Sequence, residues 1–507
     1  MHLYFDKGSS VGRRGQRFSA VVTPQSQSGP LAFASNVLWH AVNLIIGYGI
    51  ALLTSIIIAR GLGPHRTGIV SYLTWLTDTG SMLGGLGYVR AVERFVAEKQ
   101  GEKRPHLLPP IVRYCLGAIF RLSLISGVAG SALAWWSLSR SGDWVAGYAP
   151  VILLLVLVGG LWIGIQAVTR GLYDFRSLAL AVIGRATGGA LIWYLLIRLQ
   201  AEIIWFFLVA LLLTGLCAAW LASKTGTTVM VKNATPIDKA LRDRVRKYAR
   251  RVSLVIVADT IVWQRSELFF LSRYSDPSSM AFFSIAAGFS MLVARLPQSL
   301  TAVIFPVFSR RMGEGRESEA RHLYEMCTRW VFAISLLLGS AALAFAECLI
   351  RILYTNQFAD VVPLLRILVV AAIIAPLGSP AASYLYSTDK ERFYLVLAPF
   401  SVTVNVALAW LLCSRWGASG AAWANMVSQS LVTIVALAYL WIWEGMKLPV
   451  SDFARIAVVA AAYFVVCRLI APWGLMGILG GAILAAVYFA LLLALGVFRE
   501  ELRQIRH

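Results

Sequence analysis

The sequence has little negative charge, few cysteines and no recognisable nucleotide-binding loop. Its 25 Asp and Glu residues stand against 46 Lys and Arg residues, which gives a net charge of +21. The six cysteines are scattered and form no CxxC pair, which argues against a zinc site or a redox pair. No GxxxxGK[ST] segment is present, so the chain lacks the phosphate loop of proteins that use ATP directly. We therefore expect no metal and no cofactor.

Long polar stretches are also scarce, and apolar runs dominate the 507 residues. Hydrophobic residues make up 58% of the chain, and the mean hydropathy is +0.71. A membrane-crossing helix needs about 20 apolar residues to span about 30 Å of hydrocarbon. We therefore predict an all-α polytopic membrane protein with about 14 transmembrane helices. The predicted spans are 33–60, 67–92, 111–138, 147–169, 177–198, 201–223, 252–272, 278–307, 327–350, 361–386, 393–414, 418–443, 454–471 and 474–497.

The placement of basic residues predicts the orientation of these spans. If the N-terminus is cytoplasmic, most of the Lys and Arg residues fall in the tails and the even-numbered loops, as the positive-inside rule requires. Both termini are then cytoplasmic. The first 32 residues are polar and lack the apolar core of a cleavable signal. The predicted divisions are a cytoplasmic tail at 1–32, a first six-helix lobe at 33–223, a basic cytoplasmic linker at 224–251, a second six-helix lobe at 252–443, two additional C-terminal helices at 444–498 and a cytoplasmic tail at 499–507.

The basic linker carries nine Lys and Arg residues. A juxtamembrane segment of this kind is typical of a topology signal that is attracted to anionic lipid. A specific binding site for a partner is the alternative.

A short internal repeat relates the two predicted lobes. The turn Ala59–Pro64 aligns with Ser272–Pro277 at an offset of 213 residues. Six spans lie within that offset, so the two lobes have the same orientation, as in transporters built from parallel repeats. In this alignment Asp78 and Arg295 occupy positions one helical turn apart, so we expect them at a similar depth in the membrane. We predict that these two side chains face each other across one cavity.

Charged residues inside the predicted spans are the candidate functional residues. A charge at mid-membrane costs roughly 2.5–3.5 kcal/mol even on a lenient insertion scale, so it normally faces protein or water. The basic candidates are Arg121, Arg185, Arg265 and Arg295. We expect them to line a polar cavity inside the helix bundle.

Three acidic residues accompany these arginines: Asp78, Asp259 and Glu267. In a continuous helix over 252–272, Asp259 and Glu267 share one face at a spacing of eight residues, whereas Arg265 points well away from it. Each carboxylate needs a partner, a proton or a cation. Charge balance and ion coupling both remain open as roles for them.

Several segments follow one another in the order typical of a transporter family. They are Ile58–Pro64, Gly84–Gly87, Arg94–Glu98, Glu267–Ser272, Phe305–Ser309, Asn405 and Gly417–Ala424. In this order they resemble the Wzx-type oligosaccharide flippases of the multidrug/oligosaccharidyl-lipid/polysaccharide exporter superfamily. Glu267 departs from that pattern, because an aspartate is common at this position.

The resemblance implies a function as well as a fold. It implies two lobes arranged in a V, alternating exposure of a central cavity, and flipping of an undecaprenyl-pyrophosphate-linked oligosaccharide from the cytoplasmic to the outer leaflet of a bacterial inner membrane. Arg121, Arg185, Arg265 and Arg295 are then substrate-binding candidates, because guanidinium groups suit phosphate oxygens. The expected partners are this substrate, membrane lipids and other polysaccharide-assembly proteins, with no nucleic acid.

Three other functions remain as alternatives. A cation-coupled multidrug exporter of the same superfamily predicts a cavity dominated by acidic residues. A lipid II flippase handles a related lipid-linked sugar. A membrane enzyme that polymerises or ligates glycans generally needs a sizeable outer loop with catalytic groups, whereas every predicted outer connection is short. We therefore expect a transporter and not an enzyme.

Overall fold

The computed structural model describes residues 30–138, 148–232, 236–314, 316–388, 390, 392–446 and 448–498. For 30–45, 229, 302–307, 309, 312 and 313, the description covers the backbone but not the side chains. The predicted cytoplasmic tails lie outside these ranges, apart from residues 30–32.

The described residues fold almost entirely into helices and contain no strand, which confirms the predicted all-α class. The helices of the N-terminal part are α2 (Pro30–Gly101), α3 (Leu108–Leu138), α4 (Tyr148–Gly171), α5 (Phe175–Arg198), α6 (Ile203–Lys224), α7 (Thr227–Lys232), α8 (Lys239–Trp263) and α9 (Glu267–Tyr274). Those of the C-terminal part are α10 (Pro277–Gly313), α11 (Glu317–Tyr354), α12 (Val361–Ile374), α13 (Gly378–Ser387), α14 (Arg392–Trp443), α15 (Val450–Ile470) and α16 (Leu475–Ala494). Four short 3₁₀ turns join neighbouring helices at Pro105–Leu107, Asn356–Phe358, Ala375–Leu377 and Ala471–Trp473.

By length and composition, 11 of the described helical segments can cross a membrane. Two of these segments each hold two predicted spans. In α2 the chain turns at Gly63, which lies directly before Pro64 and has a φ of +73°. In α14 the chain turns at Gly417, which has a φ of +54°. Glycine adopts such left-handed angles without the Cβ clash of other residues. The chain is therefore a multi-pass membrane protein.

The predicted seventh span, 252–272, is not one continuous helix. The structure places a break at Gln264, Arg265 and Ser266, between the end of α8 and the start of α9. Arg265 has a φ of +58°, a left-handed angle that interrupts a right-handed helix. Asp259 and Glu267 therefore do not share one helix face, and that prediction was wrong.

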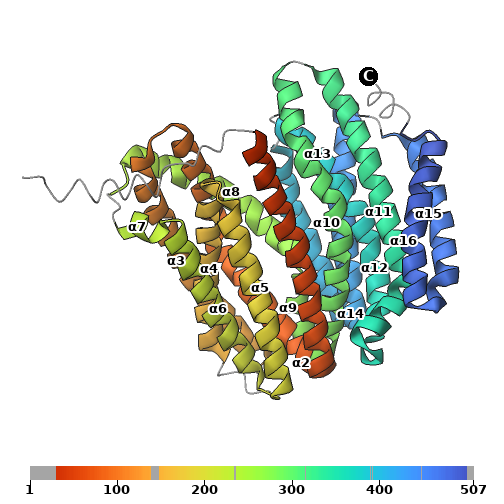
Figure 1. Ribbon diagram of the computed structural model, residues 1–507, viewed down its shortest axis with the longest axis horizontal. Helices are drawn as coiled ribbons and strands as arrows, with labels where there is room; N and C mark the ends of the chain where they lie inside the picture. The colour runs from red at the N-terminus through yellow and green to blue at the C-terminus, as the bar shows by residue number, and fades with distance from the viewer. Residues whose placement is uncertain are drawn as a thin grey trace, which may run out of the picture. The chain divides into compact units, whose positions relative to one another are not determined.

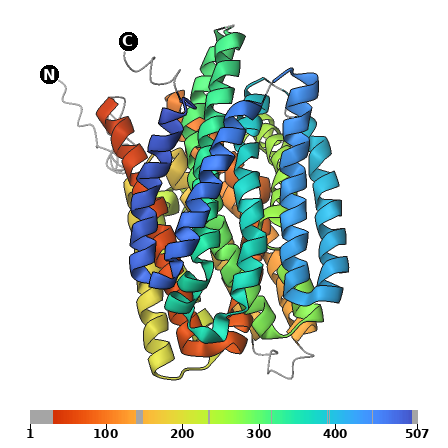
Figure 2. The ribbon, with the colours of Figure 1, turned by 90° about the vertical axis from the view of Figure 1, so that its right-hand side faces the viewer.

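The described helices fall into two compact units. The first unit contains residues up to 54 and 76–256, and the second contains 55–75 and 257–507. In the first unit α4 packs against α3, α5 and α6, and in the second α12 packs against α10, α11 and α14. The two C-terminal helices, α15 and α16, pack on each other and on α11, and Figure 2 shows them as a neighbouring pair. Figure 1 gives the order of the helices along the chain.

The turn between the first two spans belongs to the second unit, although its flanking helices belong to the first. Arg60 caps the end of α11, where its Nε donates to Leu353 O at 2.8 Å and its Nη2 donates to Ile352 O. The Ser55 Oγ lies 3.0 Å from the Tyr354 hydroxyl oxygen, within hydrogen-bond distance. The carbonyls at the end of a helix lack partners within it, so a guanidinium group stabilises them.

Within the second unit, the helix that follows the first turn of the internal repeat packs against the end of the second turn. A Cβ added at Gly68 would lie only 1.7 Å from the carbonyl oxygen of Pro277, the first residue of α10. Only a residue without a side chain fits there. The residue four positions after the Ala59–Pro64 turn therefore lies directly against Pro277, the last residue of the Ser272–Pro277 turn.

The predicted basic linker, 224–251, is largely helical in its described part. It contains α7 and the first half of α8. Val245 and Ala249 of α8 are buried, whereas Arg242, Arg246 and Lys247 are exposed. These basic residues therefore lie on the exposed face of α8, opposite the face that packs against the protein.

Candidate functional site

A buried carboxylate lies directly after the break that follows α8. Glu267 is the first residue of α9, and its side chain is 0% exposed. Its Oε1 accepts hydrogen bonds from Asn405 Nδ2 at 3.1 Å and from Asn425 Nδ2 at 3.0 Å. The Ser266 Oγ donates to Asn405 Oδ1 at 2.9 Å. We call Glu267, Asn405, Asn425 and Ser266 the buried amide site.

The fold of α14 explains how two distant amides reach the same oxygen. Asn405 precedes the turn at Gly417, and Asn425 follows it, so the two residues lie on opposite arms of a helical hairpin. A Cβ added at Gly420 would lie 2.0 Å from Leu412 O, so the arms meet too closely for a larger residue. The hairpin packs on α9, and both amides thereby converge on Glu267.

The buried amide site is not fully satisfied by the described residues. The Glu267 Oε2 is buried and has no hydrogen-bond partner among them. A buried carboxylate is costly unless it is paired, protonated or bound to a cation. The positive charge of Arg265, two residues before Glu267, acts on this carboxylate. Oxygen ligands and a buried negative charge suit a proton or a small hard cation.

Sequence reasoning identified Glu267 but not the full set of residues around it. Asn405 entered only through a family-like segment, and Ser266 and Asn425 were not predicted at all. An amide within an apolar span is the signal that points to Asn425, since such a group needs a hydrogen-bond partner in the membrane.

Three of the four basic candidates lie near the middle of long helices, whereas Arg265 lies in the break after α8. Arg121 is in α3, Arg185 in α5 and Arg295 in α10. The side chains of Arg121 and Arg295 are exposed, and neither forms an ion pair or hydrogen bond with another described residue. Arg185 is half-buried, with its guanidinium carbon 5.8 Å from the ring centre of Trp162. Exposed guanidinium groups at this depth favour an aqueous surface or an anionic ligand.

The remaining acidic candidates, Asp78 and Asp259, are both exposed, and each interacts with other groups. Asp259 lies near Tyr394 of α14, on whose phenol its charge acts. Asp78 belongs to the first compact unit and Arg295 to the second. Their predicted approach across one cavity therefore stays a prediction.

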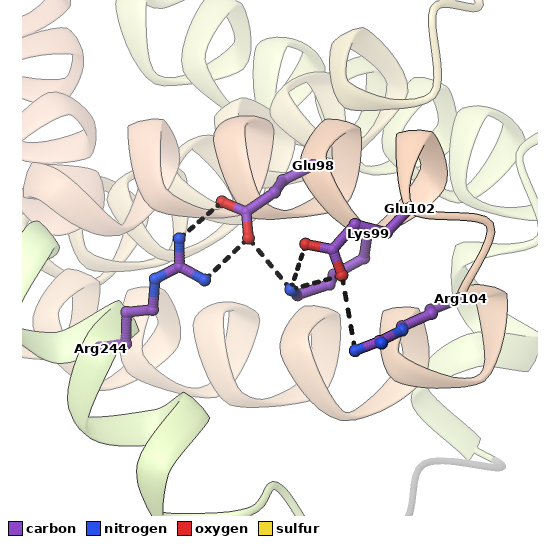
Figure 3. A network of polar contacts seen from close by, with 5 residues as sticks. All are labelled: Glu98, Lys99, Glu102, Arg104 and Arg244. Atoms are coloured by element: carbon purple, nitrogen blue, oxygen red, sulfur yellow. Dashed lines mark hydrogen bonds and ion pairs between the residues drawn. The ribbon is translucent and has the colours of Figure 1, made fainter.

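A second polar cluster fixes the start of α8 to the end of α2, as Figure 3 shows. Arg244 donates to both carboxylate oxygens of Glu98, from Nη1 at 2.8 Å and from Nη2 at 3.1 Å. Lys99 Nζ lies 3.0 Å from Glu98 and 2.8 Å from Glu102, and Arg104 lies 3.8 Å from Glu102. The charges alternate in sign, so the cluster stabilises the junction between the two helices.

These contacts shift the protonation equilibria of the cluster, which lies outside the predicted spans. Partial burial pushes the pKa of Glu98 upward, but the hydrogen bond from Lys99 and the charge of Arg244 outweigh it and hold that pKa below its ordinary value of 4.5. Hydrogen bonds to Glu102 and Glu98 raise the pKa of Lys99 above 10.5. Glu98 and Lys99 are therefore both charged near neutral pH.

Two family models match the chain. Residues 33–312 match the model described as polysaccharide biosynthesis protein, and residues 260–411 match the MatE model. The second match contains Glu267 and Asn405 but not Asn425.

Two curated relatives that match the chain are a lipid III flippase and a probable lipid II flippase. The lipid III flippase of Escherichia coli (strain K12) is 21% identical over 426 residues, which cover 82% of this chain and 99% of that protein. The probable lipid II flippase MurJ of Rhizobium meliloti (strain 1021) is 26% identical over 238 residues. That match covers 41% of this chain and only 43% of the relative.

A solved structure has the same fold. The lipid II flippase MurJ in an inward closed conformation superposes with a TM-score of 0.70 at 15% identity, covering 92% of this chain and 100% of that chain. The polysaccharide biosynthesis model covers more than half of the chain. The chain therefore belongs to the polysaccharide biosynthesis protein family, among the flippases of the multidrug/oligosaccharidyl-lipid/polysaccharide exporter superfamily.

Proposed function

We propose that this flippase moves an undecaprenyl-pyrophosphate-linked oligosaccharide from the cytoplasmic to the outer leaflet of a bacterial inner membrane, for surface polysaccharide biosynthesis. The match of residues 33–312 to polysaccharide biosynthesis proteins carries the proposal. The match to the E. coli lipid III flippase, which covers 99% of that protein, supports a lipid-linked substrate.

The physical part of the proposal concerns the pyrophosphate. This group carries negative charge, and leaving water without compensation costs several kcal/mol. Arg121 and Arg295 present exposed guanidinium groups near the middle of membrane-crossing helices. A guanidinium group donates parallel hydrogen bonds to phosphate oxygens, which lowers this cost. Arg185 and Arg265 are proposed to offer further positive charge to the same group.

Replacement of Arg295 by alanine tests this assignment. Arg295→Ala should slow the appearance of lipid-linked saccharide in the outer leaflet at equal expression, because it removes a guanidinium donor. Arg310→Ala is a matched control, since Arg310 lies in the same helix but is paired with Glu314 at 2.8 Å. Unchanged translocation in Arg295→Ala would remove the proposed role of this arginine.

The buried amide site supports a role in energy coupling. We propose that Glu267 takes up a proton or a monovalent cation as the protein changes conformation, while Asp78 and Asp259 balance the charge of the arginines. The alternative is transport down the concentration gradient of the lipid-linked saccharide, which later polymerisation maintains by removing the translocated molecule. Retained translocation after collapse of both the proton and the sodium gradients would favour that alternative.

A cation-coupled multidrug exporter is the second candidate function. The match of residues 260–411 to the MatE model, together with the buried amide site, favours it. A deletion strain discriminates between the two. Loss of surface glycan without a change in drug sensitivity supports the oligosaccharide flippase, and drug hypersensitivity with normal glycan supports the exporter. If the stranded lipid is the peptidoglycan precursor, the protein is a lipid II flippase.

A further inference from the structure

The middle of α8 carries a dense group of basic residues on its exposed side. Arg246, Lys247, Arg250 and Arg251 lie within about two turns of the helix, and all four are exposed. None of them forms an ion pair or a hydrogen bond with another described residue. We call these four residues the α8 cation patch.

The opposite side of α8 is fixed against α2. Ala249 is buried, and a Cβ added at Gly87 of α2 would lie only 1.9 Å from its carbonyl oxygen. The backbone nitrogen of Gly87 also donates to Ser253 Oγ at 3.0 Å. Nearer the start of α8, Arg244 donates to both carboxylate oxygens of Glu98. A rotation of α8 that buried the cation patch would break these contacts, so the fold keeps the patch at the surface.

The carboxylates around the first half of α8 leave the patch with a net positive charge. Glu98 and Glu102 are already paired within the cluster of Figure 3. Asp238 accepts hydrogen bonds from backbone N–H groups at the start of α8. Asp243 is exposed one turn before the patch, and its single charge offsets at most one of the four positive charges.

The second unit pairs comparable basic residues with carboxylates. These pairs lie at the end of α10 and beside the two ends of α14, and they are Arg310 with Glu314, Arg311 with Glu319, and Lys390 with Glu444. A topology signal acts through its positive charge during insertion, and pairing in the folded protein does not remove that effect. The unpaired state of the α8 cation patch therefore favours a further role in the folded protein.

An exposed leucine follows the patch on the same side of the helix. Leu254 is 69% exposed and lies three residues after Arg251 and four after Arg250, the spacings of neighbours on a helix surface. The helix rises about 7.5 Å from Arg246 to Arg251. The headgroup layer on each side of a bilayer is about 5–7.5 Å thick. The patch therefore matches a phosphate layer in height, and Leu254 lies where acyl chains begin.

We propose that the α8 cation patch is a binding site for anionic phospholipid in the leaflet beside the basic linker, the cytoplasmic leaflet under the predicted topology. The guanidinium groups hold the phosphate oxygens, and Leu254 contacts the acyl chains. Each basic residue near an anionic membrane surface strengthens binding about fivefold. The proposal does not depend on which lipid-linked sugar the protein moves, because it concerns the bulk lipid of the membrane.

Lipid binding to the purified full-length protein tests the site. The probes are phosphatidylglycerol and phosphatidylcholine with identical acyl chains, and native mass spectrometry measures both affinities. The patch variant carries Arg246→Gln, Lys247→Gln, Arg250→Gln and Arg251→Gln. The control variant removes the same number of charges from paired residues of the second unit, through Arg310→Gln, Arg311→Gln, Arg316→Gln and Lys390→Gln. We expect the preference for phosphatidylglycerol to fall at least about tenfold in the patch variant and less than about twofold in the control.

Three results would overturn the site. One is an unchanged preference in the patch variant, and another is an equal fall in both variants, which would reflect total charge alone. The third is displacement of phosphatidylglycerol from the wild-type patch by an equal concentration of undecaprenyl pyrophosphate, which would assign the patch to the transported lipid.

Photocrosslinking locates the lipid without altering the patch, so it does not depend on the folding of the variants. p-Benzoylphenylalanine replaces Leu254 or Leu395 in the full-length protein, which is reconstituted in vesicles with equal amounts of the two phospholipids. Leu395 is a matched control, because it is 48% exposed and lies three residues after one exposed basic residue, Arg392. We expect phosphatidylglycerol adducts to exceed phosphatidylcholine adducts at position 254 and the two to be similar at position 395. Similar yields of both adducts at position 254 would contradict the proposal.

Discussion

Glu267→Gln is the substitution that separates a proton or cation site from a static hydrogen-bond network. In the wild-type protein Oε1 accepts from Asn405 and Asn425, while Oε2 is buried without a hydrogen-bond partner among the described residues. Glutamine can keep Oε1 in place and put its amide nitrogen where Oε2 lies. The substitution therefore removes the negative charge and keeps both amide contacts.

The expected effect follows from linkage. A ligand that binds only the folded protein stabilises it by about 2.7 kcal/mol at 100 times its dissociation constant. The wild-type protein should therefore unfold at a higher temperature when sodium replaces choline, or when the pH is lowered, depending on which ion occupies the site. Glu267→Gln should lose that response. Without an occupant, the same substitution would raise stability, since it removes a buried charge whose desolvation costs several kcal/mol.

Thermal unfolding of the purified protein measures this response across pH and in sodium or choline chloride. Glu347→Gln is a suitable control, because the Glu347 side chain is 51% exposed and its surface ion pair with Arg351 contributes little to stability. If Glu267→Gln responds to sodium and to pH as the wild type does, the ion site lies elsewhere.

Three further predictions concern stability. Arg60→Ala should lower the free energy of unfolding by about 0.3–1 kcal/mol, because it uncaps the carbonyls at the end of α11, and Arg60→Lys should recover part of the loss in a denaturant titration. The lowered pKa of Glu98 stabilises the folded protein above pH 4.5, and this contribution is lost as the pH falls below that value. Glu98→Gln should therefore make the free energy of unfolding less dependent on pH in this acid range, and an unchanged pH dependence would contradict the assignment. Arg329 and Asp452 form a largely buried pair at 3.1 Å, so Asp452→Leu should destabilise by about 3–5 kcal/mol, whereas the double replacement with Arg329→Leu should restore most of the melting temperature.

The sequence predicts the helical architecture well, because length and hydropathy act locally. The turn before Pro277 and the glycine turns in α2 and α14 are visible as short polar or glycine-containing interruptions between apolar runs. The break at Arg265 is not visible in this way. The polar run Gln264–Glu267 marks the place, but its four residues are too few to separate a broken span from a continuous one that carries charge, and only the structure shows the left-handed angle at Arg265.

The candidate site was only partly predictable, for a related reason. An isolated charge such as Glu267 is conspicuous in an apolar span, but its partner Asn405 lies 138 residues away in the sequence. Only the fold of α14 determines which amides reach it. Likewise, the packing of Gly68 on Pro277 follows from tertiary contacts, whereas the similarity of the two turns is visible in the sequence.

The most direct test of the flippase assignment is to deplete the protein from its host and determine where lipid-linked saccharide accumulates. Membrane-impermeant labelling of intact spheroplasts and of inverted vesicles reports the outer and inner leaflets separately. We predict that an undecaprenyl-pyrophosphate-linked oligosaccharide becomes stranded on the inner leaflet within the depletion period, while its total amount is maintained or rises. An unchanged distribution between the leaflets, with normal surface polysaccharide, would contradict the assignment.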